Sequence, residues 1–352
     1  MPTDILHPTQ INRAKLLIEE IIHRLDLDLQ ESVILTEMGS SYYVYTPMIA
    51  ALAGAKRVYT IVKDSRFGTI QHIRNIGDVL ADKWNVHDKL EVVTTLSKDA
   101  ISDADIVTNL GFLRPIDKDF ISSLKYGAVI PYMREAWEYR PEDVDIKFCR
   151  ERNIPVMGTN ENYGSLDIFS QCGPLAAKMI FEAGLELKDN NITVASQDKF
   201  GDVISSYLRT CKANVTQVRE GNQSVYLEAE RLDALIIANF ESNQLIVGSG
   251  GWIEPEKLAK QHPECSVIQF IGNVDTASLS NYGIRCIPKK NIGAKRMAQT
   301  LASLGPKPVI ELHAAGLKAG ELMWNLAKSG FDSQQIEQTL GIPGGLCQPI
   351  DY

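Results

Sequence analysis

A few side chains in this chain could carry acid–base chemistry on a charged substrate. His313 has an imidazole that ordinarily titrates near neutrality, which suits proton transfer, and it lies in a run of small residues, HAAG. Arg114 and Arg134 carry planar guanidinium groups that match a carboxylate or a phosphate. An acid such as Glu135 or Glu161 could orient the imidazole. We interpret His313, Glu135, Arg114 and Arg134 as the catalytic set, with the arginines holding an anionic substrate.

Each of these residues also has a structural interpretation. A lone histidine on a helix is commonly buried and hydrogen-bonded, and Arg114 could form a surface ion pair. The run MREAWEYRPED at 133–143 could be a solvated charged loop. No group of His, Cys and Asp residues has the spacing of metal ligands, so we expect no metal.

A second group of residues could bind a nucleotide. Residues 192–195 form an apolar strand, 200–211 place apolar residues at helical spacing, and 215–218 form a strand that leads to Glu220. This order opens a dinucleotide-binding fold, in which the first turn holds a pyrophosphate and a late acid holds the ribose. The residues that we expect to bind the cofactor are Ser196, Gly201, Glu220, Asn239, Gly272 and Asn273.

The glycine positions of this turn are altered. Ser196, Asp198 and Gly201 occupy the three places of G-x-G-x-x-G. An aspartate at the second place adds bulk and negative charge where the pyrophosphate would lie. Glu220 favours NAD over NADP because a carboxylate accepts from a 2′-hydroxyl and repels a 2′-phosphate, whereas Arg219 beside it has the opposite effect.

The first part of the chain alternates helices and strands. We expect helices at 9–25, with Thr9 as cap, within 42–55 and at 70–84, and strands at 33–35, 57–62, 90–94, 105–109, 128–133 and 154–157. Pro47 either follows a capping Thr46 or lies inside a longer helix. Such alternation predicts a parallel sheet with helices on both faces, in a substrate domain of residues 1–165.

The second part repeats the pattern. We expect a linking helix at 161–184, a helix at 227–232, strands at 234–238, 266–271 and 283–287, a long helix from Pro308 to Lys328, and a loop beyond Phe331. The nucleotide-binding domain would cover residues 166–314, and residues 315–352 would return to the first domain. The predicted fold is α/β, with two Rossmann-like open parallel-sheet domains and a cleft between them.

Ligands of open α/β sheets bind beyond the carboxyl ends of the strands. This rule adds further polar residues to the candidates around the cleft, namely Glu37, Glu138, Glu161 and Asp275.

Composition restricts the class of protein. The 352 residues are 44% hydrophobic and 23% charged, as in ordinary globular proteins, and the net charge of −8 argues against nucleic acid. No run of 18 apolar residues would span a membrane, and the start, MPTDILHPTQINR, is unlike a signal peptide. The six cysteines lack C-x-x-C spacing, which is typical of free thiols. We therefore expect a cytoplasmic protein.

Four stretches resemble D-2-hydroxyacid dehydrogenases (the formate/glycerate dehydrogenase group) and adenosylhomocysteine hydrolase. They are GTNENYGSLDIF (158–169), LELKDNNITVASQDKFGDVISSYLRT (185–210), VIQFIGNVDTASL (267–279) and ELHAAGLKAGELM (311–323). The arginine with which these dehydrogenases hold a carboxylate is absent at 271–273, and the hydrolase's lysine and aspartate are replaced by Asn160, Glu161 and Asn162. The resemblance implies the architecture, a nicotinamide cofactor and, by analogy, a homodimer.

These observations predict an NAD(P)-dependent oxidoreductase that acts on a small polar or anionic metabolite in the interdomain cleft. One alternative is a dehydrogenase-derived protein that has lost its cofactor and binds a metabolite, which Asp198 favours. Another is an adenosylmethionine-binding protein that uses the turn TEMGSS and Asp64 of the first domain.

Overall fold

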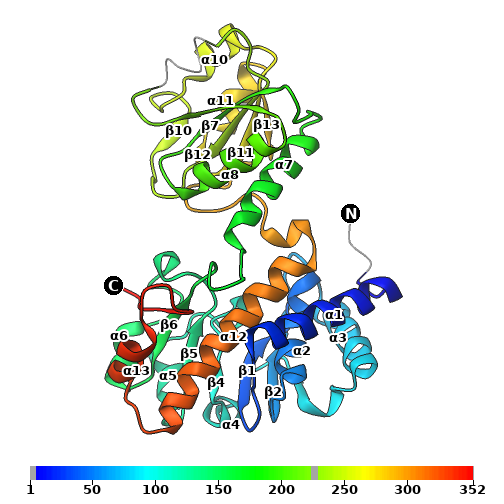
Figure 1. Ribbon diagram of the computed structural model, residues 1–352, viewed down its shortest axis with the longest axis vertical. Helices are drawn as coiled ribbons and strands as arrows, with labels where there is room; N and C mark the ends of the chain where they lie inside the picture. Colours follow the sequence, from blue (N-terminus) through cyan, green and yellow to red (C-terminus); the bar gives the residue numbers. More distant parts are fainter. Residues whose placement is uncertain (1–4, 223–228, 352) are drawn as a thin grey trace. The chain divides into compact units, whose positions relative to one another are not determined.

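The computed structural model describes residues 5–222 and 229–351 and divides into two compact units (Figure 1). Unit 1 comprises residues 1–168 and 305–352, and unit 2 comprises residues 169–304. The chain returns to unit 1 at the start of helix α12 (Pro306–Lys328), so the whole of this helix belongs to unit 1. The sequence suggested boundaries at 165 and 314.

Unit 1 contains a parallel sheet between two layers of helices. Its strands are β1 (Val33–Glu37), β2 (Arg57–Ile61), β3 (Leu90–Val93), β4 (Ile106–Val107), β5 (Ile130–Tyr132), β6 (Val156–Thr159) and β14 (Cys347–Gln348). Its helices are α1 (Pro8–Leu25), α2 (Tyr45–Leu52), α3 (Ile70–Trp84), α4 (Lys98–Asp103), α5 (Lys118–Ser123), α6 (Ile146–Glu151), α12 and α13 (Ser333–Leu340). Short 3₁₀ helices are η1 (Ser41–Val44), η2 (His87–Lys89), η3 (Gly111–Leu113) and η4 (Ala136–Glu138).

The strand order of unit 1 matches that of dinucleotide-binding domains. Strands β3, β2, β1 and β4 are neighbours in that order, and β5 pairs with β6, which pairs with the antiparallel β14. A parallel bridge between Ile106 and Val129 joins the two groups. The order β3-β2-β1-β4-β5-β6 reverses between β1 and β4, and ligands of open α/β sheets bind at such a reversal.

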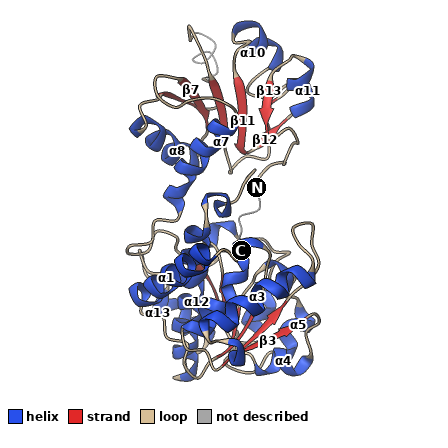
Figure 2. Cartoon of the chain, turned by 90° about the vertical axis from the view of Figure 1, so that its right-hand side faces the viewer, coloured by secondary structure: helices blue, strands red, loops and turns tan. Residues whose placement is uncertain are grey.

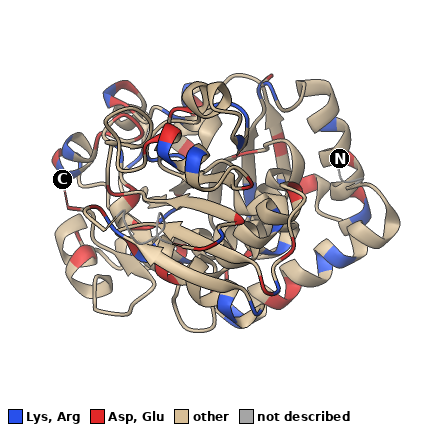
Figure 3. Ribbon diagram, turned by 90° about the horizontal axis from the view of Figure 1, so that it is seen from above, with Lys and Arg blue, Asp and Glu red and all other residues tan. Residues whose placement is uncertain are grey.

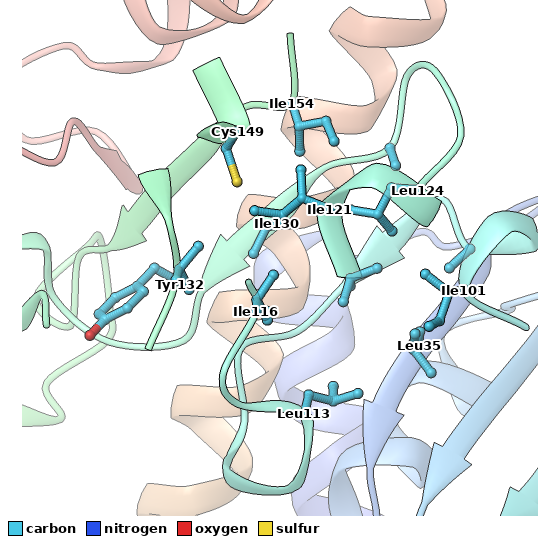
Figure 4. Close-up of a cluster of buried hydrophobic side chains, with 14 of the residues drawn as sticks. Leu35, Ile101, Leu113, Ile116, Ile121, Leu124, Ile130, Tyr132, Cys149 and Ile154 are labelled. Carbon is cyan, nitrogen blue, oxygen red and sulfur yellow. The ribbon is translucent and has the colours of Figure 1, made fainter. Parts of the chain in front are cut away.

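Apolar packing holds the loops at the carboxyl ends of these strands. All five residues of β1 are buried. Figure 4 shows Leu35 of β1 in a cluster with Leu113, which directly precedes Arg114, and Tyr132, which lies two residues before Arg134. Each such side chain stabilises the fold by roughly 1.5–3 kcal/mol when it is removed from water. The apolar core therefore fixes the position of the backbone at Arg114 and Arg134.

Unit 2 contains a second parallel sheet, again with helices on both sides (Figure 2). Its strands are β7 (Asn191–Ala195), β8 (Asn214–Val218), β9 (Ala234–Ala238), β10 (Leu245–Val247), β11 (Ser266–Ile271), β12 (Asn273–Val274) and β13 (Arg285–Ile287). Its helices are η5 (Phe169–Gln171), α7 (Cys172–Glu182), α8 (Lys199–Thr210), α10 (Pro255–Gln261), α11 (Thr276–Asn281) and η6 (Leu301–Leu304). The sheet order is β8-β7-β9-β11-β13, so the reversal lies between β7 and β9.

The predicted fold class is confirmed: the chain is α/β, with two open parallel sheets, and its long C-terminal helix returns to unit 1.

Several local predictions are wrong. The linking helix does not begin at 161, because residues 161–165 form turns, with Gly164 at φ 56°, residues 166–168 are irregular, and α7 begins at Cys172. Helix α1 is capped by His7, whose side chain accepts from Thr9 N, rather than by Thr9. Pro47 is the third residue of α2, which continues directly from η1.

The C-terminal tail is also more regular than a loop. Helix α13 begins with a capping box between Asp332 and Gln335 and buries Ile336. Cys347 and Gln348 then pair with β6. Of the helix predicted at 227–232, residues 227 and 228 lie outside the described residues, and 229–232 are not helical.

Candidate functional site

Glu37 lies at the carboxyl end of β1 with only 7% of its surface exposed. Its carboxylate accepts a hydrogen bond from the Phe112 N–H at 2.6 Å. Burial raises the pKa of Glu37, while the Phe112 N–H and the charges of Arg114 and Arg134 partly oppose that rise. Gly111, in the loop after β4, lies against this carboxylate, since a Cβ at that position would be 3.4 Å from Oε2 of Glu37.

Arg114 follows β4 and is already paired within unit 1. Its Nη1 donates to Oδ2 of Asp143 at 2.8 Å, and both side chains are largely buried. Its Nε is buried and has no partner among the described residues. Nearby in sequence, Asn109 accepts from Met133 N at 2.8 Å, while its Nδ2 is buried and likewise unpartnered in the described chain. Two buried N–H donors therefore follow β4 without an acceptor, which is costly unless a ligand or water supplies one.

Arg134 follows β5, and both its backbone N–H and its backbone carbonyl are hydrogen-bonded. Its N–H donates to Tyr132 O, and its carbonyl accepts from Thr159 N, both at 2.7 Å. Within residues 5–222 and 229–351 its half-buried guanidinium makes no hydrogen bond or ion pair. This cation is therefore available to an external anion.

His313 of α12 is 3% exposed and lies in the electrostatic range of Arg134. Its Nδ1 is 2.6 Å from Oγ1 of Thr46, whose hydroxyl donates to Tyr43 O at 3.2 Å. The hydroxyl has a single hydrogen, so we assign the Nδ1–H as donor to Thr46 and leave Nε2 as an acceptor. Burial, with a smaller contribution from Arg134, lowers the pKa of His313 to about 4, so the imidazole is neutral at pH 7.

The acid that was expected to orient His313 has other partners. Glu135 is buried, accepts from Trp137 Nε1 at 2.6 Å, and accepts from Glu161 N at 3.3 Å. Thr46 orients the imidazole instead. Of the predicted catalytic set, Arg134 lies within electrostatic range of both Glu37 and His313, and Arg114 lies within range of Glu37. Sequence reasoning missed Thr46, which carries no signal, and Asn109, which the end of its strand could have indicated.

In unit 2 a carboxylate of the chain accepts hydrogen bonds from backbone N–H groups of the corresponding loops. Asp198 caps α8, where Oδ1 accepts from Phe200 N at 3.0 Å. Its Oδ2 accepts from the N–H groups of Phe240 and Glu241, at 2.6 and 3.2 Å, in the loop after β9. A dinucleotide would need the N–H groups at the N-terminus of α8 for its phosphates, and the carboxylate of Asp198 lies at that point. In this arrangement the residues of unit 2 do not fit a nicotinamide cofactor.

The other predicted cofactor residues mostly have structural roles. A Cβ on Gly201 would lie 2.3 Å from Cβ of Ser196, so this glycine permits close helix–strand packing. Glu220 accepts from Gln197 Nε2 at 3.2 Å. Gly272 has φ 126°, which favours glycine.

The asparagines differ from each other. Asn239 is fully buried, and both polar atoms of its amide lack a partner among the described residues. Asn273 accepts from Asn291 at 3.4 Å. Asp275, another candidate, caps α11 by accepting from Ser278 N at 3.0 Å.

Residues of both charges occur throughout the chain. In Figure 3 the ribbon positions of basic and acidic residues are interspersed. Among the described residues no three His, Cys, Asp or Glu side chains could together hold a metal ion. None of the helices in the described chain has the length and apolar character needed to span a membrane.

Comparison with known proteins defines the class of fold. No protein-family model and no curated protein matches the sequence. The structure of a dipicolinate synthase from Bacillus subtilis matches with a TM-score of 0.54 and 10% identity, over 87% of this chain and 100% of that one. The structure of a dipicolinate synthase from Bacillus halodurans matches with a TM-score of 0.50 and 10% identity, over 85% of this chain and 99% of that one.

A putative D-3-phosphoglycerate dehydrogenase oxidoreductase from Ralstonia solanacearum matches with a TM-score of 0.48 and 12% identity, over 86% of this chain and 96% of that one. The two dipicolinate synthase structures show that the chain shares their fold over most of its length. They confirm the two-domain architecture that the sequence resemblance predicted.

Proposed function

We propose that the chain binds a small anionic metabolite at the carboxyl ends of β1, β4 and β5 in unit 1. The observation that carries this proposal is the guanidinium of Arg134, which forms no ion pair among the described residues. A half-buried cation without an ion-pair partner is unfavourable for the fold, and a carboxylate or phosphate would supply two hydrogen bonds to it. Ligand binding would therefore explain why the fold keeps a half-buried guanidinium without an ion pair at this position.

Neighbouring groups define what else the metabolite carries. The neutral His313 offers Nε2 as an acceptor, which suits a hydroxyl or amino group beside the anionic group. Asn109 and Arg114 supply two further unpartnered donors in the described chain. A small hydroxy acid or amino acid has this combination of groups.

The experiment measures ligand-induced stabilisation in unit 1. Thermal-shift runs with glycolate, lactate, malate and inorganic phosphate would compare the wild type with Arg134→Gln, and Arg152→Gln serves as the control because Arg152 is an exposed arginine of the same unit. We expect at least one anion to raise the melting temperature of the wild type and the control but not of Arg134→Gln. Equal shifts in all three proteins would refute the site.

An NAD(P)-dependent oxidoreductase is the second candidate. The sheet order of unit 2, with its reversal between β7 and β9, and the acid Glu220 after β8 favour it. It requires the carboxylate of Asp198 to leave its present partners. A thermal shift with NADH or NADPH would support this candidate, whereas a shift with adenosylmethionine alone would support a nucleotide in unit 1. The homodimer and the cytoplasmic location stay predictions, and light scattering tests the first.

A further inference from the structure

The turn between β7 and α8 and the loop after β9 flank the strand-order reversal of unit 2. In an open α/β sheet this is where a nucleotide's phosphates would bind, on N–H groups of the helix N-terminus. Whether unit 2 can bind a nucleotide therefore depends on whether the N–H donors of these two loops are already hydrogen-bonded. In this structure one side chain, Asp198, bonds to both of them.

The Asp198 carboxylate makes the contacts that a phosphate would make. Oδ1 accepts from Phe200 N in the first turn of α8 at 3.0 Å. Oδ2 accepts from Phe240 N at 2.6 Å and from Glu241 N at 3.2 Å. The carboxylate is favoured by these three N–H hydrogen bonds and, at the N-terminus of α8, by the helix dipole. The same donors cannot serve a second anion at the same time.

Two neighbouring contacts close the turn further. The hydroxyl oxygen of Ser196 accepts from Gly201 N at 3.1 Å and from Asp198 N at 3.3 Å, so the next donor of α8 is also engaged. Gln197 donates to the carboxylate of Glu220 at 3.2 Å, which occupies the acid expected to hold a ribose. The substitutions at the first two glycine positions thus form one internally bonded set.

We propose that the carboxylate of Asp198 substitutes for a ligand phosphate and thereby suppresses the binding of nicotinamide nucleotides to unit 2. A pyrophosphate placed at the same N–H groups would meet a fixed negative charge and find its donors taken. Removal of the carboxylate frees Phe200 N, Phe240 N and Glu241 N for the nucleotide. This inference concerns residues of unit 2 alone and does not depend on the anion site of unit 1.

The test is a fluorescence titration of the full chain with NADH. The proteins are the wild type, Asp198→Gly, the double variant Ser196→Gly/Asp198→Gly, and the control Asp202→Asn. Asp202 is exposed in the first turn of the same helix, so the control removes an equal charge without opening the turn. We expect the double variant to bind NADH about tenfold more tightly or better than the wild type, and the control to bind like the wild type.

Two results would overturn the proposal. One is a wild type that binds NADH as tightly as the folded glycine variants, and the other is the absence of any gain in those variants. Should circular dichroism show that the glycine variants do not fold, Asp198→Asn decides by the same criterion, because it keeps the size and removes the charge. Hydrogen exchange of the Phe240 and Glu241 amides adds an independent measurement. Faster exchange in Asp198→Asn than in Asp202→Asn is expected, and equal rates would contradict the proposed bonds.

Discussion

The carboxyl ends of the two sheets differ in how their polar groups are satisfied. In unit 1 the guanidinium of Arg134 forms no ion pair in the described chain, and donors of Asn109 and Arg114 are buried without an acceptor. In unit 2 Asp198 bonds to backbone N–H groups of two loops. The same type of edge can thus be arranged for a ligand or bonded internally, and the choice depends on a few side chains. The unpartnered groups of Asn109 and Arg114 lower stability in unit 1, as the unpartnered amide of Asn239 does in unit 2, whereas the hydrogen bonds accepted by Asp198 contribute to the stability of unit 2.

The largest expected effect concerns the neutral imidazole in unit 1. The pKa of His313 is lowered from 6.5 to about 4, so the folded state resists protonation more than the unfolded state does. Stability should therefore fall as the pH drops from about 6.5 towards about 4, by up to about 3 kcal/mol. Urea unfolding at a series of pH values would measure this slope. His313→Gln should lose most of the slope, and an unchanged slope would show that His313 is not buried as described.

The next effect should appear in unit 2. Asp198→Ala removes the cap of α8 and leaves Phe240 N and Glu241 N without their acceptor. We expect a loss of about 2 kcal/mol in the free energy of unfolding. Hydrogen exchange on peptides of 199–210 and 238–241 would localise the loss to unit 2. Asp202→Asn removes a charge from the same helix. If it lowers the free energy of unfolding as much as Asp198→Ala does, the loss comes from the charge near the helix N-terminus and not from the hydrogen bonds of Asp198.

Glu37 provides a smaller, pH-dependent test of unit 1. Because the pKa of its buried carboxyl is raised above the ordinary 4.5, the folded state favours the protonated acid. Its contribution to stability is therefore full below pH 4.5 and falls as the pH rises through the higher folded pKa. Glu37→Gln keeps an acceptor for Phe112 N and should flatten this part of the unfolding profile. Wild type and variant curves that stay parallel above pH 4.5 would contradict a raised pKa.

The smallest effect on stability is expected for Arg134→Gln. Its guanidinium has no hydrogen bond or ion pair among the described residues, so its removal should change the free energy of unfolding by less than about 0.5 kcal/mol. Anion binding should nevertheless be lost. A large destabilisation without loss of anion binding would show that Arg134 supports the fold of unit 1 and does not bind the anion.

Apolar spacing predicted much of the architecture. Helix α3 has the expected bounds, and the unit β7–α8–β8 lies within a residue or so of its predicted limits. Helices α3 and α8 bury one face, β7 buries all but its first residue, and β8 alternates exposed and partly buried residues, so their patterns are strong. Helix α13 was missed because only Ile336 is buried in it, and its start depends on a capping box. A pattern with a single buried residue has no period to detect.

The candidate site residues were chosen by residue type and by their place after predicted strands. In the structure Glu37 ends β1, Arg114 lies in the loop after β4 and Arg134 follows β5. This choice could not show that Arg114 is paired with Asp143, since long side chains choose their partners in three dimensions.

The amino-acid order by itself determined the alternation of strands and helices, and it placed an aspartate in the first turn of unit 2. Only the tertiary structure decided what that aspartate does, because its acceptor atoms meet N–H groups 42 residues further along the chain. The same holds for His313, whose tautomer is set by Thr46 at a separation of 267 residues. The periodic spacing of apolar residues is a property of neighbours in the sequence. Hydrogen bonding and burial, in contrast, arise from contacts that form only when distant segments pack together.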